Sequence, residues 1–285
     1  MSSQIKITEC PRDAMQGLHD FVPTDIKAAY INLLLQVGFD TIDFGSFVSP
    51  KAIPQLRDTA EVLGKLDLNN TRSKLLAIIA NYRGAEDAVQ HEEISYLGYP
   101  FSISETFQLR NTNSTIQDAF ITVKRIQELA VTKQKELLVY LSMGFGNPYG
   151  DDWNIEIVQQ WTEKLVNEGI KTIALADTIG IASAEQINKL YPFLCTQFPG
   201  TEFGIHLHST PTAWYEKAEA AYQSGCTRFD SALKGYGGCP MAADDLTGNI
   251  ATENLIGYLQ SQNIDTGLNM DKLREAMEYS DRIFG

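Results

Sequence analysis

The chain has 285 residues, of which 44% are hydrophobic and 21% charged, and its formal net charge is −13. These values are ordinary for a globular protein, and the negative charge argues against nucleic acid or an anionic membrane as a partner. The length suits either one α/β barrel or two smaller domains. No apolar run reaches the ~18 residues expected of a transmembrane helix.

The first residues lead directly into a predicted strand, so we see no signal or transit peptide. None of the 4 cysteines has C-x-x-C spacing, and neither a disulfide framework nor a zinc cluster is therefore indicated. These features lead us to expect a protein of the reducing cytoplasm.

Short runs rich in β-branched and aromatic residues alternate along the chain with stretches of helical periodicity. Eight strands, each followed by a helix, predict a (β/α)8 barrel (TIM barrel) as a single catalytic domain over residues 1–285. The main alternative is a doubly wound open sheet, but no G-x-G-x-x-G motif follows the first strand. The predicted strands are residues 5–9, 39–45, 74–80, 94–103, 136–143, 172–177, 202–208 and 227–233.

The helical stretches carry apolar residues at three- and four-residue spacing, as over 26–37 and 116–130. Thr24-Asp25 and Ser114-Thr115 are predicted to cap the N-termini of these two helices, and Gly38 is predicted to end the first. An extra C-terminal helix is predicted outside the eight units, from about Asp271 to Tyr279.

Two histidines stand at the end of the seventh predicted strand. His206 and His208 are two residues apart, so on a strand both side chains project to the same side. Paired imidazoles suit a divalent transition metal, whereas the alternative is a pair of ordinary strand histidines. The chain has only 4 histidines, and finding half of them in one tripeptide favours the metal interpretation.

Further polar residues follow other predicted strands. In a TIM barrel the functional groups gather at the C-terminal ends of the strands, so these residues are predicted to share one rim. Taken alone, Arg12-Asp13 could be a surface ion pair, Asp177 a helix N-cap, and the segment around Cys239 a glycine-rich turn. They are Arg12 and Asp13 after the first strand, Asp43 in the second, Asp177 at the end of the sixth, and Cys239 and Asn249 after the eighth.

Six short motifs occur in order: Pro-Arg-Asp at 11–13 with Gln16, Ser-Phe-Val-Ser-Pro-Lys at 46–51, Asp-Thr-Ile-Gly at 177–180, His-x-His at 206–208, Gly-Gly-Cys-Pro at 237–240 and Gly-Asn-Ile-Ala-Thr-Glu at 248–253. In combination they resemble 3-hydroxy-3-methylglutaryl-CoA (HMG-CoA) lyase, a member of the metal-dependent TIM-barrel superfamily that includes isopropylmalate synthase. The resemblance runs from about residue 5 to residue 273. The motifs at 46–51 and 237–240 are the more specific to the lyase branch.

The resemblance implies a divalent ion, Mg2+ or Mn2+, held by Asp13, His206, His208 and Asn249, with open positions for a bidentate substrate. The implied reaction is retro-Claisen cleavage of HMG-CoA to acetyl-CoA and acetoacetate, so the implied partner is an acyl-CoA thioester. A homodimer is consistent with the resemblance, which leaves the oligomeric state open.

The resemblance also implies roles for single residues. Arg12 would stabilise the oxygen of the acetyl-CoA enolate, and Cys239 would return a proton to the enolate carbon. A carboxylate of the rim, among which Asp43 is a candidate, would take the hydroxyl proton. Asp177 matches a polar residue of the family's site and would orient groups around the metal.

The chain departs from the family pattern around the acyl pocket. Asp43 replaces a glutamate, Leu138 stands where an arginine is expected, and Ser-Thr-Pro-Thr at 209–212 replaces Asp-Thr-Tyr-Gly. The segment 144–151 lacks the cysteines common there. None of these departures changes a presumed metal ligand, and they leave the accepted acyl group open.

Two other functions remain compatible with the sequence. One is a related enzyme of the superfamily, either an acyl-CoA condensing enzyme or a 2-oxo-acid aldolase. The other is a non-catalytic barrel that binds a CoA ester. Cys239 favours the lyase over a synthase, and the presence of Arg12, Asp13 and Asn249 beside it disfavours the non-catalytic barrel. Metal-dependent turnover of a CoA thioester would separate these functions.

Overall fold

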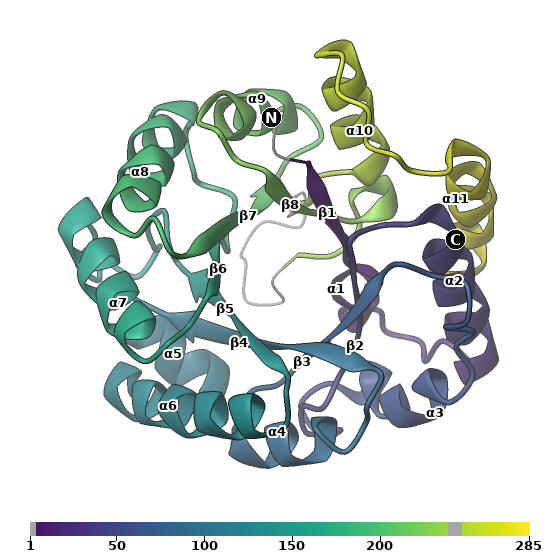
Figure 1. Ribbon diagram of the computed structural model, residues 1–285, viewed down its shortest axis with the longest axis horizontal. Coiled ribbons are helices and arrows are strands. Elements are labelled where there is room, and N and C mark those ends of the chain that lie inside the picture. The colour runs from purple at the N-terminus through teal and green to yellow at the C-terminus, as the bar shows by residue number, and fades with distance from the viewer. Residues whose placement is uncertain (1–3, 239–246) are drawn as a thin grey trace.

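The computed structural model describes residues 4–238 and 247–285, and these form a closed parallel barrel surrounded by helices (Figure 1). Each of the first seven strands pairs in parallel with the next along the chain, and pairing of the first strand with the eighth completes the ring. The predicted (β/α)8 fold is therefore confirmed.

All eight predicted strands are present, and their ends differ from the prediction by no more than two residues. A ninth strand of two residues, β9, pairs antiparallel with the seventh. The strands are β1 (Lys6–Glu9), β2 (Thr41–Ser46), β3 (Lys74–Ile78), β4 (Ile94–Ser102), β5 (Glu136–Ser142), β6 (Thr172–Asp177), β7 (Glu202–Ser209), β8 (Arg228–Ser231) and β9 (Gly248–Asn249).

Most of the helices surround the barrel, whereas α1 lies within their ring and contacts β2. The predicted C-terminal helix is confirmed as α11, which packs against α2. No described helix is long and apolar enough to cross a membrane. The helices are α1 (Pro11–Gln16), α2 (Thr24–Val37), α3 (Thr59–Leu63), α4 (Tyr82–Ala88), α5 (Glu105–Thr112), α6 (Ile116–Thr132), α7 (Ile155–Asn167), α8 (Ala184–Gln197), α9 (Trp214–Gln223), α10 (Thr252–Ser261) and α11 (Met270–Phe284), with short 3-10 helices η1 (Pro54–Leu56) and η2 (Leu233–Gly235).

The helix ends follow the predicted signals in two of three cases. Gly38 ends α2 with φ 86°, a left-handed conformation that glycine adopts without strain. Thr115 caps α6 by accepting a hydrogen bond from the backbone N–H of Asp118. The predicted cap at Thr24-Asp25 is wrong, because the hydroxyl of Thr24 donates to Asp58 over 2.8 Å and Pro23 occupies the cap position.

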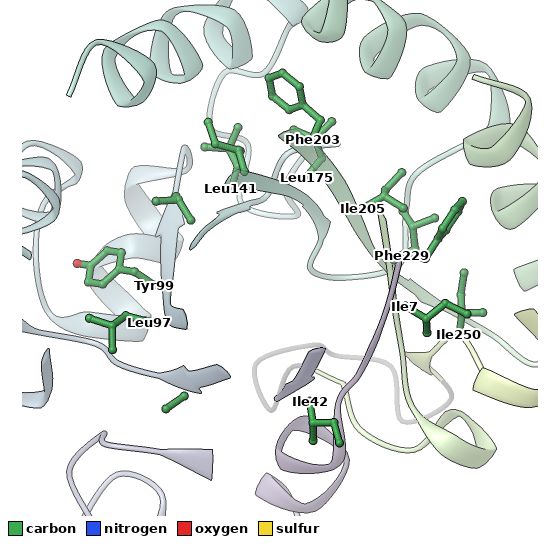
Figure 2. Packing of buried hydrophobic residues seen from close by; sticks show 14 of the residues in the cluster. Ile7, Ile42, Leu97, Tyr99, Leu141, Leu175, Phe203, Ile205, Phe229 and Ile250 are labelled. Atoms are coloured by element: carbon green, nitrogen blue, oxygen red, sulfur yellow. The ribbon is translucent and has the colours of Figure 1, made fainter. Parts of the chain in front are cut away.

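Alternation along each strand divides the buried side chains between two layers. In β7, Phe203, Ile205 and Leu207 belong to the main core between the barrel and its helices, as Figure 2 shows for Phe203 and Ile205. Burial of such a side chain contributes about 1.5–3 kcal/mol to stability. The intervening residues His206 and His208 consequently face the inside of the barrel.

An apolar cluster lies inside the barrel, next to the buried guanidinium of Arg228, which lies 5.4 Å from the ring centroid of Tyr96. Leu138, at the position where the family pattern has an arginine, packs there as a hydrophobic residue. The predicted site residues lie at the C-terminal end of the barrel, in keeping with the general plan of this fold. The buried cluster consists of Leu76, Ile78, Tyr96, Leu138, Tyr140 and Ala174.

Glu9 ties the segment that follows β8 to the first strand. Its buried carboxylate accepts hydrogen bonds from the backbone N–H of Leu233 over 2.8 Å and from the hydroxyl of Thr252. Burial raises the pKa of Glu9 to about 8, against the opposing effect of these hydrogen bonds. Because Leu233 and Thr252 flank β9, these contacts help to hold Asn249 beside its partner in β7, His208.

Candidate active site

A cavity of about 330 Å³ opens at the C-terminal end of the barrel. The predicted metal-site residues Asp13, His206 and His208 line it together with Arg12. Apolar side chains form much of the remaining wall, and α5 lies at its edge. The further lining residues include Gln16, Val48, Ala52, Ile53, Ile78, Pro100, Phe107, Arg110, Asn111, Tyr140, Ser142, Ala176 and Thr178.

The two histidines face each other, with their Nε2 atoms 3.2 Å apart. The Nδ1 atom of His208 lies 2.9 Å from the carbonyl oxygen of Thr178, and that of His206 lies 3.2 Å from a carboxylate oxygen of Asp230. A carbonyl oxygen only accepts hydrogen bonds, so Nδ1 of His208 carries a proton, and the neighbouring carboxylate oxygen favours the same tautomer for His206. The two Nε2 lone pairs then converge, and this arrangement needs a proton or a metal ion between them.

The protonation preferences of the two rings differ. Burial alone would lower the pKa of His206, but the hydrogen bond to Asp230 and the negative charge of Asp13 raise it overall. Burial lowers the pKa of His208, and the neighbouring His206 lowers it further. One ring can therefore hold a proton between the Nε2 atoms without a metal, and a divalent ion would displace that proton.

Asp13 supplies a carboxylate to the same point. Its Oδ2 lies 4.0 Å from Nε2 of His208, and donor atoms of Asp13, His206 and His208 all lie within 4.8 Å of one another. Burial would raise the pKa of Asp13, but Arg12 and the two histidines lower it below the ordinary value. The group is thus held as the anion that a metal ligand must be.

Asn249 completes the set of four predicted ligands. Its amide nitrogen donates to Oδ2 of Asp13 over 2.7 Å and to the carbonyl of Tyr236 over 2.9 Å. Pairing of β9 with β7 brings it opposite His208 in register. The structure thus brings Asp13, His206, His208 and Asn249 together, and their role as ligands stays a prediction.

Arg12 is held by charged and polar partners on two sides. Its Nε and Nη2 donate to Oδ2 of Asp43 over 3.0 and 2.5 Å, and its Nη1 donates to Asp13 over 2.9 Å and to Gln16 over 3.0 Å. Burial would lower the pKa of Arg12, but Asp43 and Asp13 raise it overall. The guanidinium is therefore a fixed positive charge at the cavity wall.

Asp43 does not line the cavity and contacts the site through Arg12. Its side chain is 1% exposed and lies outside the set of residues that line the cavity. Burial raises the pKa of Asp43 to about 6, although the neighbouring Arg12 opposes this. Its contacts support a role in orienting Arg12 more directly than a role as the base.

Asp177 also lies outside the cavity lining. The side chain is buried and forms an ion pair with Lys217, with 2.7 Å between Nζ and Oδ2. Its carboxylate also accepts hydrogen bonds from the backbone N–H groups of Ile181 and Ala182. Its position therefore excludes direct contact with a ligand in the cavity, while its predicted role of orienting groups around the metal stays open.

Cys239 lies outside the described residues. The backbone just before it passes close to the site: Gly237 has φ 100°, and a Cβ there would lie 2.6 Å from the amide nitrogen of Asn249. Only glycine therefore fits at position 237, where the backbone passes close to Asn249. Of the described cysteines, Cys10 and Cys226 are buried and Cys195 is partly exposed.

Two contacts of the histidines were missed in the sequence. Asp230 lies in the predicted strand 227–233, and the corresponding β8 is buried on both faces. A strand without alternation does not show which of its residues face the inside of the barrel, so the sequence pointed only weakly to Asp230 as a partner of His206. Thr178 acts through its backbone carbonyl, which residue identity does not reveal.

A family model described as HMGL-like matches residues 4–279 of the chain. The chain belongs to the HMGL-like family. Hydroxymethylglutaryl-CoA lyase YngG of Bacillus subtilis is 32% identical over 278 residues, which cover 96% of this HMGL-like chain and 91% of that protein. The resemblance inferred from the motifs is therefore confirmed.

Solved structures agree with this assignment. The crystal structure of the B. subtilis HMG-CoA lyase superposes on the HMGL-like chain with a TM-score of 0.92 at 32% identity, covering 99% of this chain and 94% of that one. An HMG-CoA lyase from A. baumannii, in complex with coenzyme A and 3-methylmalate, gives a TM-score of 0.90 at 32% identity, with coverages of 99% and 92%.

Proposed function

We propose that this HMGL-like protein is a divalent-metal-dependent carbon–carbon lyase that cleaves HMG-CoA to acetyl-CoA and acetoacetate. The family assignment and the names of its relatives support the reaction class. The observation that carries the proposal is the convergence of Asp13, His206 and His208 beside the fixed charge of Arg12 in one cavity.

The donor set fits Mg2+ or Mn2+, the latter being the better match to two imidazoles. Asp13, His206, His208 and Asn249 would hold the ion, Asn249 through its amide oxygen, although its nitrogen is the atom that faces Asp13 in this structure. When bound, the ion supplies Lewis acidity that lowers the pKa of a substrate hydroxyl. Asp230 and the Thr178 carbonyl direct both Nε2 lone pairs to the same point.

The chain's own residues account for the rest of the reaction. A carboxylate of the site takes the proton of the C3 hydroxyl, and the C2–C3 bond breaks. The electron pair of the C2–C3 bond passes towards the oxygen of the thioester carbonyl. The products of this step are acetoacetate and the enolate of acetyl-CoA. Arg12, oriented by Asp43, stabilises the negative enolate oxygen, and the thiol of Cys239 returns a proton to C2.

We also propose that residues 1–285 act as one catalytic domain in the cytoplasm. The family match over 4–279 supports the single domain. A proton-donating thiol requires Cys239 to stay reduced, which supports a reducing compartment.

The proposal is tested with purified protein and a panel of 3-hydroxy-3-methylacyl-CoA esters, with mass detection of the products. We expect acetyl-CoA and acetoacetate from HMG-CoA with Mg2+ or Mn2+, and no products after chelation of the metal. Product formation only in the direction of condensation would favour a synthase. Binding without turnover of any ester would favour a non-catalytic barrel.

Cys239 gives a second test of the mechanism. Cys239→Ser is expected to lower kcat by about 10²-fold or more, because a hydroxyl is a much weaker acid than a thiol. Alkylation should inactivate the enzyme, and peptide mapping with and without substrate should locate the modified thiol. Buried Cys10 should stay unmodified, and Cys195→Ser, at a partly exposed thiol, is the control that should retain activity. Full activity of Cys239→Ser, or inactivation that tracks Cys10, would contradict this role.

A further inference from the structure

A buried ammonium group, that of Lys217, contacts the backbone of the proposed metal ligand His208. Lys217 of α9 has a side chain that is 7% exposed, and its Nζ lies 2.7 Å from Oδ2 of Asp177. The same Nζ lies 2.8 Å from the carbonyl oxygens of Gly180 and His208. Three acceptors thus match the three N–H groups of the ammonium, and one of them is the backbone of a proposed metal ligand.

Asp177 makes this arrangement possible. It stands at the end of β6 and faces away from the barrel interior, towards α9. Besides pairing with Lys217, it accepts hydrogen bonds from the N–H groups of Ile181 over 2.8 Å and Ala182 over 3.0 Å. Asp177 therefore fixes the turn after β6 and supplies the counter-charge that allows an ammonium to be buried there.

The turn that Asp177 fixes also contacts the side chain of His208. The carbonyl of Thr178 accepts from Nδ1 of His208 over 2.9 Å, while the Thr178 hydroxyl accepts from the backbone N–H of Met143 over 2.9 Å. His208 is thereby held at two points, its backbone by Lys217 and its ring by Thr178. The contact to the ring fixes the tautomer that leaves Nε2 free for a metal.

The same turn also touches the segment that carries Asn249. Gly180 has φ 74°, and a Cβ built on it would lie 2.6 Å from a methyl carbon of Thr247. Thr247 directly precedes β9, which pairs with β7 at His208 and Asn249. The turn therefore packs against both strands that carry these two proposed ligands.

We propose that Lys217, acting with Asp177, is a positioning residue that holds His208 in place for metal binding. This inference rests on the proposed metal site. Lys217 does not line the cavity, so it acts through His208 and not on a substrate. A buried ion pair on its own is weak support for a contribution to stability, because desolvation offsets the attraction. The contact to the His208 carbonyl gives this pair a specific role.

The test compares two variants that remove a buried ammonium. Lys217→Met is expected to weaken Mn2+ binding by about tenfold or more, the usual effect of losing a group that orients a metal ligand. Lys27→Met is the matched control: Lys27 is also buried, pairs with Asp58 over 2.7 Å and donates to the carbonyl of Gln55, but contacts no proposed ligand. It should lower the melting temperature to a similar extent and leave the Mn2+ affinity unchanged. Free Mn2+ is measured by electron paramagnetic resonance, without substrate.

A double variant separates positioning from stability. Lys217→Met leaves the carboxylate of Asp177 buried without its cation. The double variant Asp177→Asn/Lys217→Met removes this unpaired negative charge. We expect the double variant to recover part of the lost melting temperature while its Mn2+ affinity stays low. If the single variant does not fold, the Mn2+ affinity is measured on the double variant instead.

Three results would overturn the role of Lys217. Unchanged Mn2+ affinity in the folded single variant would do so, as would recovery of affinity together with stability in the double variant. A parent chain that binds no Mn2+ would instead overturn the proposed metal site, and this role with it. The parent measurement therefore distinguishes failure of the proposed function from failure of the inference.

Discussion

Replacing Arg12 with glutamine is expected to lower kcat by about 10³-fold or more with a modest change in KM. Arg12 is a fixed positive charge, held by Asp43 at 2.5 Å and by Asp13 at 2.9 Å. Such a preorganised charge stabilises the enolate oxygen more than the neutral thioester oxygen of the bound substrate, so its loss acts mainly on the transition state. The measurement is steady-state turnover of HMG-CoA at saturating metal.

Two further variants help to interpret this result. Asp43→Asn keeps the arginine but weakens its orientation, so we expect a smaller loss of kcat than in Arg12→Gln. Arg57→Gln removes a surface cation that stacks on Phe21, 3.5 Å from the ring centroid, and should leave turnover unchanged. Turnover of Arg12→Gln equal to that of the parent would show that Arg12 serves only to hold the structure.

The barrel and the histidine pair could be predicted because both depend on local periodicity. Strand and helix patterns repeat over short windows, and the two-residue spacing of His206 and His208 places them on one side of β7 whatever the neighbouring strands do. The cap at Thr24 failed because its hydroxyl bonds to Asp58, 34 residues away. A hydrogen-bond partner so far away along the chain cannot be predicted from the residues next to Thr24.

The direction of Asp177 illustrates a second limit. β6 is buried on both faces, and its residues Ile173, Ala174, Leu175 and Ala176 are apolar in either register. A strand of this kind shows no alternation, so the sequence does not reveal which side its last residue faces. The partner of Asp177 is Lys217, 40 residues further on in a helix, and only the folded structure brings the two together.

His208→Ala is expected to abolish stoichiometric Mn2+ binding and to reduce turnover to background, while the barrel stays folded. The ring of His208 lines the cavity and is absent from the main hydrophobic core, so its removal leaves the packing between barrel and helices intact. The contact between Lys217 and His208 uses the backbone carbonyl and survives the substitution. Loss of binding would therefore report the missing Nε2 ligand and not a displaced strand.

Metal binding is measured by electron paramagnetic resonance of free Mn2+, and folding by circular dichroism and thermal melting. His91→Ala is the control, because His91 packs against Phe47 with 5.4 Å between ring centroids and lies outside the proposed ligand set. That variant should bind one Mn2+ per chain as the parent does. Full Mn2+ occupancy in His208→Ala would remove His208 from the ligand set, and the convergence of the two Nε2 atoms would then need a proton alone to explain it.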